Sequence, residues 1–518
     1  GMADFEEAET LATQIRIGSL SLQLSELESS VVGAQLGSQA ISTSLKAGAI
    51  GLAIVMVFMI IMYAVPGIAA SLALAIYTTL VIATLYLFEI TLTLPGIAGI
   101  ILGIGMAVDA NVIVFARVRE EIATGKSVQT SMKIGFQKAM SAILDGNITT
   151  LIASVVLMAL GSGTVKGFAY TLMIGIILSL FTAMVVTRYI LYSLYALGLK
   201  SEKLYGRAKE RKSIDFIGKK AVFFTISGII IAAGLISMGV HSATEGKALN
   251  YGLDFMGGTS TTADFGKDMT IEDIENDIVP YVEEVTGDSD VQATKVEGTT
   301  QVTIKTRTLS LDERQKLEDT LAENCDVDAS TITSQSISST ISGEMRSDAL
   351  KAVIVSCIFM LLYIWFRFKD IRFAASAILA LVHDVLVVIT VYALVRISVG
   401  STFIACVLTI VGYSINDTIV IFDRIRENLA LKTGKQTAED LREIANKSLT
   451  QTLSRSINTS ITTFIMVVML YILGVASIRD FSLPLMAGLV CGAYSSICIA
   501  TELWYVMKVH LGKNKATK

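Results

Sequence analysis

Long apolar stretches recur along the chain and are separated by short polar connections. Each is about 20 residues long, which is the length that an α-helix needs to cross the hydrocarbon core of a bilayer. The expected membrane helices lie at about 46–64, 67–89, 96–116, 141–160, 168–196, 221–240, 349–366, 373–395, 401–422, 456–474 and 482–507. This pattern predicts an α-helical polytopic membrane protein with about eleven spans, or fewer if two neighbouring stretches form one helix.

The composition supports a membrane protein and argues against several other classes. Hydrophobic residues make up 53% of the chain and charged residues 17%, against about 25% charged residues in soluble domains. The five cysteines and three histidines show no spacing typical of a disulfide framework or a zinc site. Gly125-Lys126-Ser127 resembles the end of a phosphate-binding loop, but Glu120 replaces the first glycine of that motif. We expect no ATPase or other catalytic residues, no metal, no cofactor and no nucleic-acid partner, so an ion gradient or an external source must supply any energy.

The lysines and arginines indicate which face of the membrane is cytoplasmic. If the spans alternate in direction, the basic connections all fall on one face, at 117–138, 200–220, 367–372, 424–455 and 513–518. Basic connections stay on the cytoplasmic side, which predicts a multi-pass protein of the cytoplasmic (inner) cell membrane. The opposite face then carries an acidic insert at 241–345 and residues 1–45. Since nothing in the chain would carry residues 1–45 outside, we expect a first span and more of an outer domain upstream.

The chain contains an internal duplication. Gly105–Glu120 has the sequence GMAVDANVIVFARVRE and Gly412–Glu427 has GYSINDTIVIFDRIRE, with the glycine, the phenylalanine, both arginines and the last glutamate in register. A second, shorter repeat, NITT at 147–150 and SITT at 460–463, follows near the start of the next span. The two copies have the same direction in the alternation of spans. We therefore expect two parallel repeats related by an axis along the membrane normal.

The acidic insert alternates between strand and helix patterns. Strands are expected at 259–265, 291–297, 299–307 and 330–338, and amphipathic helices at 270–285 and 310–323. This β-α-β-β-α-β order predicts a small ferredoxin-like α+β domain on the extracytoplasmic side. It shows no nucleophile and base arranged for catalysis, and the fold by itself implies no activity.

Polar side chains interrupt the apolar spans within both repeats. Asp109 and Asn111 lie in one copy, and Asn416 and Asp417 lie in the other. An ionised aspartate at the centre of a membrane helix costs roughly 2.5–3.5 kcal/mol, so we expect these residues to face the bundle interior and to serve a pathway. Further polar residues enter other spans, namely Asp145, Asn147, His383, Asp384, Arg455 and Asn458.

Structural roles are an alternative for some of these residues. Asp145 and His383 are equally compatible with structural hydrogen bonds, and Arg455, near the start of its span, is open to either interpretation. Four arginines at the cytoplasmic ends of the repeated spans are expected to anchor the topology: Arg117, Arg119, Arg424 and Arg426.

Several long motifs resemble the SecD/SecF family of protein-export membrane proteins. On the SecD side these are Gln14–Leu20 and Gly103–Glu121, and on the SecF side they are Asn250–Thr259, Gly412–Asn428 and Asn446–Ser460. The likeness covers essentially the whole chain, and the motifs follow one another in the family's order. It implies a SecD–SecF fusion that lacks its first helix and most of its first outer domain. The two bundles would then be like those of the resistance–nodulation–division (RND) superfamily.

The resemblance also implies the domain organisation. The expected parts are the end of a truncated SecD-like extracytoplasmic domain at 1–45, a SecD-like bundle of five spans at 46–200, a cytoplasmic linker at 201–220, the first SecF-like span at 221–240, a SecF-like extracytoplasmic domain at 241–345, a SecF-like bundle of five spans at 346–510 and a cytoplasmic tail at 511–518.

By this resemblance the protein is expected to be an auxiliary subunit of the Sec translocase that uses the proton motive force to complete export. Asp109, Asp417 and Arg455 match the positions that the family uses for proton passage. The implied partners are the SecYEG channel, YajC-like or YidC-like membrane proteins, the unfolded polypeptide and the lipid bilayer. Two alternatives are an RND-type small-molecule efflux pump and a passive scaffold of the translocon. Sodium is an alternative coupling ion, because carboxylates, asparagines and threonines bind either ion.

Overall fold

The chain divides into two compact units. The computed structural model describes residues 28–31, 34–161, 163–208, 212–244, 246–288, 291–296, 299–325, 327–432, 434 and 436–513. One unit comprises the described parts of 1–33 and 257–342, and the other those of 34–256 and 343–518. The first is a small α+β domain and the second is a helix bundle, as predicted.

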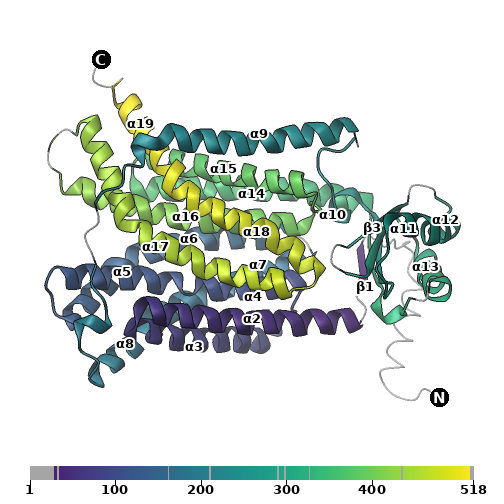
Figure 1. Ribbon diagram of the computed structural model, residues 1–518, viewed down its shortest axis with the longest axis horizontal. Coiled ribbons are helices and arrows are strands. Elements are labelled where there is room, and N and C mark those ends of the chain that lie inside the picture. The colour runs from purple at the N-terminus through teal and green to yellow at the C-terminus, as the bar shows by residue number, and fades with distance from the viewer. Residues whose placement is uncertain are drawn as a thin grey trace, which may run out of the picture. The chain divides into compact units, whose positions relative to one another are not determined.

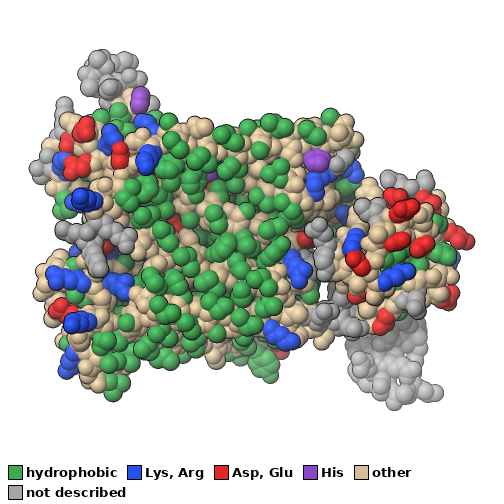
Figure 2. All heavy atoms as spheres, viewed as in Figure 1, with side chains coloured by type: hydrophobic (Ala, Val, Ile, Leu, Met, Phe, Trp, Pro, Cys, Tyr) green, Lys and Arg blue, Asp and Glu red, His purple; other side chains and the backbone are tan. Residues whose placement is uncertain are grey.

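Eleven helices in the described part of the chain are long and apolar enough to cross a membrane, which confirms the predicted number (Figure 1). In the first half they are α2 (Ala34–Tyr63), α3 (Val65–Leu87), α4 with α5 (Leu94–Met106 and Asp109–Ala123), α6 (Val128–Leu160), and α7 with α8 (Gly163–Phe181 and Thr187–Ala196). In the second half they are α9 (Lys220–Thr244), α14 (Ser339–Phe368), α15 (Ile371–Val395), α16 (Ser401–Ala430), α17 (Ala438–Leu473), and α18 with α19 (Ala476–Ser495 and Thr501–Lys513). Figure 2 shows hydrophobic side chains over the middle of one bundle face and lysines and arginines toward its ends, as a lipid-facing surface requires.

Several helices begin earlier than the hydropathy pattern predicted. α2 starts at Ala34 rather than near residue 46, and α17 starts at Ala438 rather than near residue 456. A capping box begins α17: the Thr437 hydroxyl accepts from the Asp440 N–H at 3.2 Å, and the Asp440 carboxylate accepts from the Thr437 N–H at 2.8 Å. The apolar pattern marks only the part of a helix that suits the bilayer, so polar turns beyond it escaped the prediction.

The two repeated spans form the centre of the bundle. In the span made of α4 and α5, 89% of the most apolar window is buried, and in α16 the value is 94%. The other spans range from 11% to 61%. α16 packs most extensively against α6 of the other half, while α17 packs against α2 and α4. The halves are therefore interlocked through their repeated spans.

The duplicated sequence produces duplicated contacts between the halves. A Cβ on Gly412 of α16 would come within 3.2 Å of the Thr150 Cα of α6, and a Cβ on Gly105 of α4 would come within 2.9 Å of the Thr463 Cα of α17. The glycines match in the repeat, and so do the threonines. Small residues allow such close approach of helix backbones within a membrane. In one of the two contacts, the Thr150 hydroxyl also donates to the Gly412 carbonyl at 3.0 Å.

One π-helical turn interrupts the last span of each half. These turns are Thr182–Val186 between α7 and α8, and Ser496–Ala500 between α18 and α19. They occupy matching places in the two halves. π-turns concentrate at functional sites and re-aim the side chains that follow them. The apolar pattern contained no sign of them.

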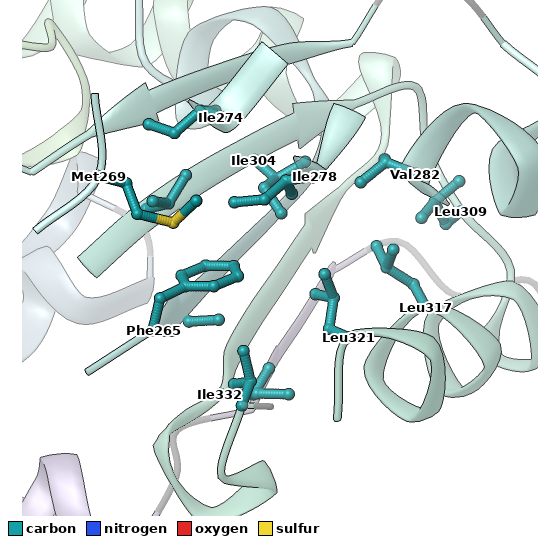
Figure 3. Close-up of a cluster of buried hydrophobic side chains, with 13 residues drawn as sticks. Phe265, Met269, Ile274, Ile278, Val282, Ile304, Leu309, Leu317, Leu321 and Ile332 are labelled. Atoms are coloured by element: carbon teal, nitrogen blue, oxygen red, sulfur yellow. The ribbon is translucent and has the colours of Figure 1, made fainter. Parts of the chain in front are cut away.

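The small unit is built on one antiparallel sheet with the order β1-β5-β2-β4-β3. Its strands are β1 (Glu28–Val31), β2 (Gly258–Asp264), β3 (Gln292–Lys295), β4 (Gln301–Thr306) and β5 (Thr333–Ile337), and its helices are α11 (Ile271–Asp277), α12 (Val279–Thr286) and α13 (Leu311–Asn324). The elements β2 to β5 follow the predicted β-α-β-β-α-β order. Their hydrophobic side chains, among them Phe265, Ile304 and Leu321, meet in one core (Figure 3).

The first strand joins this sheet from a distant part of the sequence. β1 pairs with β5 at the sheet edge, with Glu28 opposite Ile337 and Val31 opposite Ser334. The sequence assigned 1–45 to the end of another outer domain, and residues 1–27, 32 and 33 of that segment lie outside the described residues. The edge pairing of β1 was not predicted, because strand partners depend on tertiary neighbours.

Candidate functional site: a buried carboxylate and arginine cluster

The third span breaks just before Asp109. α4 ends at Met106 and α5 begins at Asp109, with Ala107 and Val108 in a turn between them. The Val108 N–H reaches only the Gly105 carbonyl, at 3.4 Å. Asp109 therefore lies in the first turn of α5, where backbone N–H groups lack intrahelical acceptors. α16 runs unbroken through the matching position.

Asp109 borders a small polar cavity inside the bundle. Its side chain is 5% exposed. The cavity has room for about one water molecule. Its polar lining includes Asp109, Asn147, Thr150, Tyr413 and Asn416, which come from α5, α6 and α16. The structure thus brings together one predicted aspartate and two predicted asparagines, and it adds a threonine and a tyrosine.

Asp417 and Arg455 lie on the same interior side of the bundle as Asp109. Each is 8% exposed. Asp417 lies close enough to Asp109 for their charges to interact, and Arg455 interacts in the same way with Asp417. Among the described residues, Asp109 Oδ1, Asp417 Oδ2 and Arg455 Nη2 have no hydrogen-bond partner. Such groups are rare in protein interiors and are available to an ion or to water.

The site departs from the symmetry of the repeats. Asp109 matches Asn416 in the alignment, and Asp417 matches Ala110, so the two carboxylates are offset by one residue. Among the described residues, the arginine that interacts with Asp417 comes from the second half. If both aspartates ionise, two negative charges face one positive charge, and a single proton or monovalent cation neutralises the cluster. This stoichiometry suits binding and release of one ion in a low-dielectric interior.

Further polar atoms around the site were missed by sequence reasoning. Beside the predicted Asn111 and Asn416, four side chains of α16 and α17 have a buried oxygen without a hydrogen-bond partner in the described chain: Tyr413, Ser456, Ser460 and Thr463. Ser456, Ser460 and Thr463 follow the i, i+4, i+7 spacing of one helix face. That spacing was the signal that could have found them.

Other predicted residues lie in separate contacts. Asp145 accepts from Arg367 Nε of α14 at 2.5 Å and from the Tyr363 hydroxyl at 2.8 Å. Asn458 donates to the Tyr63 hydroxyl of α2 at 2.9 Å. Asn147 borders the cavity, but its amide nitrogen donates to the carbonyl one turn earlier on its own helix. These geometries favour the structural interpretation of Asp145.

His383 and Asp384 form a second buried cluster. Asp384 Oδ1 lies 3.0 Å from His383 Nδ1 and accepts from the Cys491 thiol at 3.2 Å. Asp384 Oδ2 accepts from the Ser414 and Ser495 hydroxyls at 2.6 and 2.8 Å. The sequence showed no cysteine near a histidine, yet one ligand atom from each of His383, Asp384 and Cys491 lies within 4.8 Å of the others. Because internal hydrogen bonds already occupy Asp384, we interpret the cluster as a hydrogen-bond network.

Glu502 on α19 was not identified from the sequence. Its side chain is fully buried, and neither carboxylate oxygen has a hydrogen-bond partner among the described residues. It follows the π-helical turn Ser496–Ala500 by two residues. A single acid in a long apolar run was the available signal.

Comparison with known proteins places the chain in a family. The family described as protein export membrane protein SecD/SecF, C-terminal, matches residues 17–196 and 316–510. The protein translocase subunit SecDF of Bacillus subtilis is 36% identical over 97% of this chain and 69% of the relative. The chain belongs to the SecD/SecF family. It is a multi-pass membrane protein of that family, which confirms the resemblance and the fold class inferred from sequence.

Solved SecD/SecF structures match along the whole chain. The crystal structure of SecDF from Thermus thermophilus, titled a translocon-associated membrane protein, superposes with a TM-score of 0.84 at 34% identity, over 99% of this chain and 68% of that one. A SecDF structure in a super-membrane-facing form gives a TM-score of 0.72 at 32% identity, over 100% and 68%. The chain spans about two thirds of the length of these relatives.

Proposed function

We propose that this SecD/SecF-family protein is an auxiliary subunit of the Sec translocase and that proton entry through its membrane bundle completes polypeptide export. Relatives named protein translocase subunits along nearly the whole chain support the export role. The observation that carries the ion coupling is the buried cluster of Asp109, Asp417 and Arg455. Charged groups at this depth are costly, and in membrane proteins they mark ion pathways.

The cluster can carry one ion by changing its net charge. With both aspartates ionised, it holds one excess negative charge, which attracts a proton from the side to which it opens. After protonation of either Asp109 or Asp417, the cluster is neutral. Release of the proton to the other side regenerates the anionic state. The hydroxyl and amide oxygens of α16 and α17 that lack partners can hold water along this route.

The position of the cluster links ion binding to movement of the halves. Asp109 belongs to the first half, while Asp417 and Arg455 belong to the second. A change in charge at this shared site therefore favours one relative arrangement of the repeats over another. In transporters with internal repeats, such rearrangement around a central site gives alternating access. Here the movement would act on the polypeptide through the outer segments.

The proposed partners are those of a translocase subunit. They are the SecYEG channel, YajC-like or YidC-like membrane proteins, and the unfolded polypeptide on the outer side of the membrane. The exposed hydrophobic side chains along α2, α9 and α14, such as Ile61, Leu235 and Phe366, contact lipid or a membrane partner.

Export in vesicles tests the proposal. Inverted membrane vesicles containing the Sec translocon and the full-length protein are given a preprotein, with and without a proton gradient. We expect Asp109→Asn and Asp417→Asn to abolish the gradient-dependent part of export. Asp348→Asn serves as a matched control, because this carboxylate is 42% exposed and pairs with Lys351 one turn away.

The outcome also separates the alternatives. A passive scaffold predicts that Asp109→Asn exports as well as the wild type. An RND-type efflux pump predicts normal export but loss of resistance to small toxic molecules. Replacing the proton gradient by a sodium gradient identifies the coupling ion, since only the true ion restores export.

A further inference from the structure

Four charged side chains from the two repeats form a closed ring. Arg117 Nη1 lies 3.1 Å from Glu120 on its own helix and 3.1 Å from Glu427 of the other repeat. Arg424 Nη1 lies 3.2 Å from Glu427 on its own helix, and Arg424 Nη2 pairs with Glu120 of the other repeat. The two arginines match in the sequence duplication, and so do the two glutamates. Each half thus contributes one arginine and one glutamate.

The ring presents its arginines inward and its carboxylates toward the aqueous end. The side chains of Arg117 and Arg424 are 7% and 9% exposed, against 33% and 39% for Glu120 and Glu427. Neither arginine Nε has a hydrogen-bond partner in the described residues. Arg455, which forms the ion cluster together with Asp109 and Asp417, interacts electrostatically with both ring arginines. Buried positive charge therefore lies between the aspartates and the end of the helices.

The ring and the ion cluster lie at different levels along the same helix, α5. Eight residues separate Arg117 from Asp109 in the sequence, which corresponds to a rise of about 12 Å along α5. α5 ends at Ala123 and leads into the connection with Lys126, which the basic residues assign to the cytoplasmic face. An ion that leaves the cluster in this direction has to pass the ring.

Each arginine has two alternative ways to be neutralised. One partner is three residues along its own helix, and the other belongs to the opposite repeat. Separation of the halves breaks Arg117–Glu427 and Arg424–Glu120, but it leaves Arg117–Glu120 and Arg424–Glu427 intact. Neither arginine is then left as an unpaired buried charge, which would be strongly unfavourable. The ring can therefore open and close without a large penalty, as a two-state element requires.

We propose that the Arg117–Glu120–Arg424–Glu427 ring is the cytoplasmic gate of the ion path. This inference rests on the proposed ion-coupled function and identifies the residues that control ion release. In the closed arrangement, buried guanidinium groups exclude cations, as arginines do in selective membrane pores. When the repeats separate, the cross-repeat pairs break and the ion cluster gains access to the cytoplasm.

A proton-leak measurement tests the gate. The double variant Glu120→Gln/Glu427→Gln removes both carboxylates, so the two arginines repel one another and the gate loses its closed form. In vesicles with an imposed proton gradient and no preprotein, we expect dissipation about tenfold faster than in the wild type. Glu121→Gln is the matched control, because Glu121 is adjacent to Glu120 but, among the described residues, pairs with Lys126 and Lys138 of its own half and with no residue of the other half.

A second variant keeps the test decisive if the double variant does not fold. Glu120 and Glu427 both lie 3.1 Å from Arg117 Nη1, so cysteines placed there can be joined by a short bifunctional thiol reagent. Joining Glu120→Cys to Glu427→Cys replaces the lost ion pairs between the repeats by a covalent link, which holds the gate closed. We expect export to lose its gradient-dependent part after the reaction, while the wild type treated with the same reagent keeps it.

The outcomes distinguish the gate from the proposed function. A leak that disappears when Asp109→Asn is added supports the gate, because the leaking ions then use the proposed path. A folded double variant without a leak, or a leak that persists with Asp109→Asn, overturns it. Failure of the proposed function would give a different result. In that case, Asp109→Asn in an otherwise wild-type chain would leave gradient-dependent export unchanged.

Discussion

Arg367 donates from Nε to Asp145 Oδ2 at 2.5 Å and so joins α14 of the second half to α6 of the first. The Tyr363 hydroxyl donates to the other oxygen of Asp145 at 2.8 Å. In the matching contact, Asn458 of α17 donates to the Tyr63 hydroxyl of α2 at 2.9 Å. The halves are thus held together by related polar contacts on both sides, one ionic and one neutral.

Loss of one partner of the Asp145–Arg367 ion pair is expected to destabilise the bundle. Asp145→Asn or Arg367→Met leaves a largely buried charge without its counterion, at a cost of about 1–3 kcal/mol. The double variant should lose less than the sum of the two single losses, because neither charge is then unpaired. Thermal unfolding of the detergent-solubilised protein measures this coupling. Additive losses would mean that the two charges do not stabilise each other.

The close glycine contacts between the halves are expected to be sensitive to one added methyl group. Gly105→Ala and Gly412→Ala place a Cβ against the backbone of Thr463 and Thr150, so each should lower stability by about 1–3 kcal/mol. Gly228→Ala on α9 is the control, because no other atom lies within 4 Å of its added Cβ. That substitution should be neutral or slightly stabilising, as alanine favours a helix. Equal effects at all three sites would contradict tight packing of the repeats.

The small outer unit should lose stability in acid through Glu313. The pKa of this carboxyl is lowered from 4.5 to about 2, because Arg307 donates to it and the Ser310 N–H does so too. Its ionised form therefore stabilises the folded state above pH 4.5, and this contribution is lost as the pH falls toward 2. Solvent screening of a partly exposed group limits the effect to about 1 kcal/mol.

Hydrogen exchange at the backbone amides of α13 measures this contribution. Glu313→Gln should speed exchange at neutral pH and should remove most of the acid dependence between pH 4.5 and 2. Glu323→Gln, on the last turns of the same helix, is the control. An acid dependence that survives in Glu313→Gln would assign the stabilisation to another group.

The sequence was sufficient to predict the features that follow from the periodicity of apolar residues and from the free-energy cost of inserting charged residues into a membrane. Apolar length gave the spans, the duplication gave the parallel repeats, and the insertion cost of Asp109 and Asp417 placed them in the bundle interior. Strand and helix alternation gave the order of β2 to β5. These features depend on local pattern, which a single chain displays.

Features that depend on neighbouring helices were not predictable. The proximity of Cys491 to His383 and the pairing of Asp145 with Arg367 require knowledge of which helices pack together. The arginines Arg117 and Arg424 were interpreted as topology anchors, because the ring that joins them exists only when the repeats meet. The break before Asp109 and the π-helical turns escaped because apolar periodicity continues through them.

The most direct test of ion-coupled export measures proton movement and export in the same vesicles. A pH-sensitive dye reports protons that leave the lumen, while protease protection reports the preprotein that enters it. The wild type should move protons only while a preprotein is being exported under a gradient, and Asp109→Asn should lose both signals together. Gradient-driven export by Asp109→Asn at the wild-type rate would contradict the account, and so would wild-type export without proton movement.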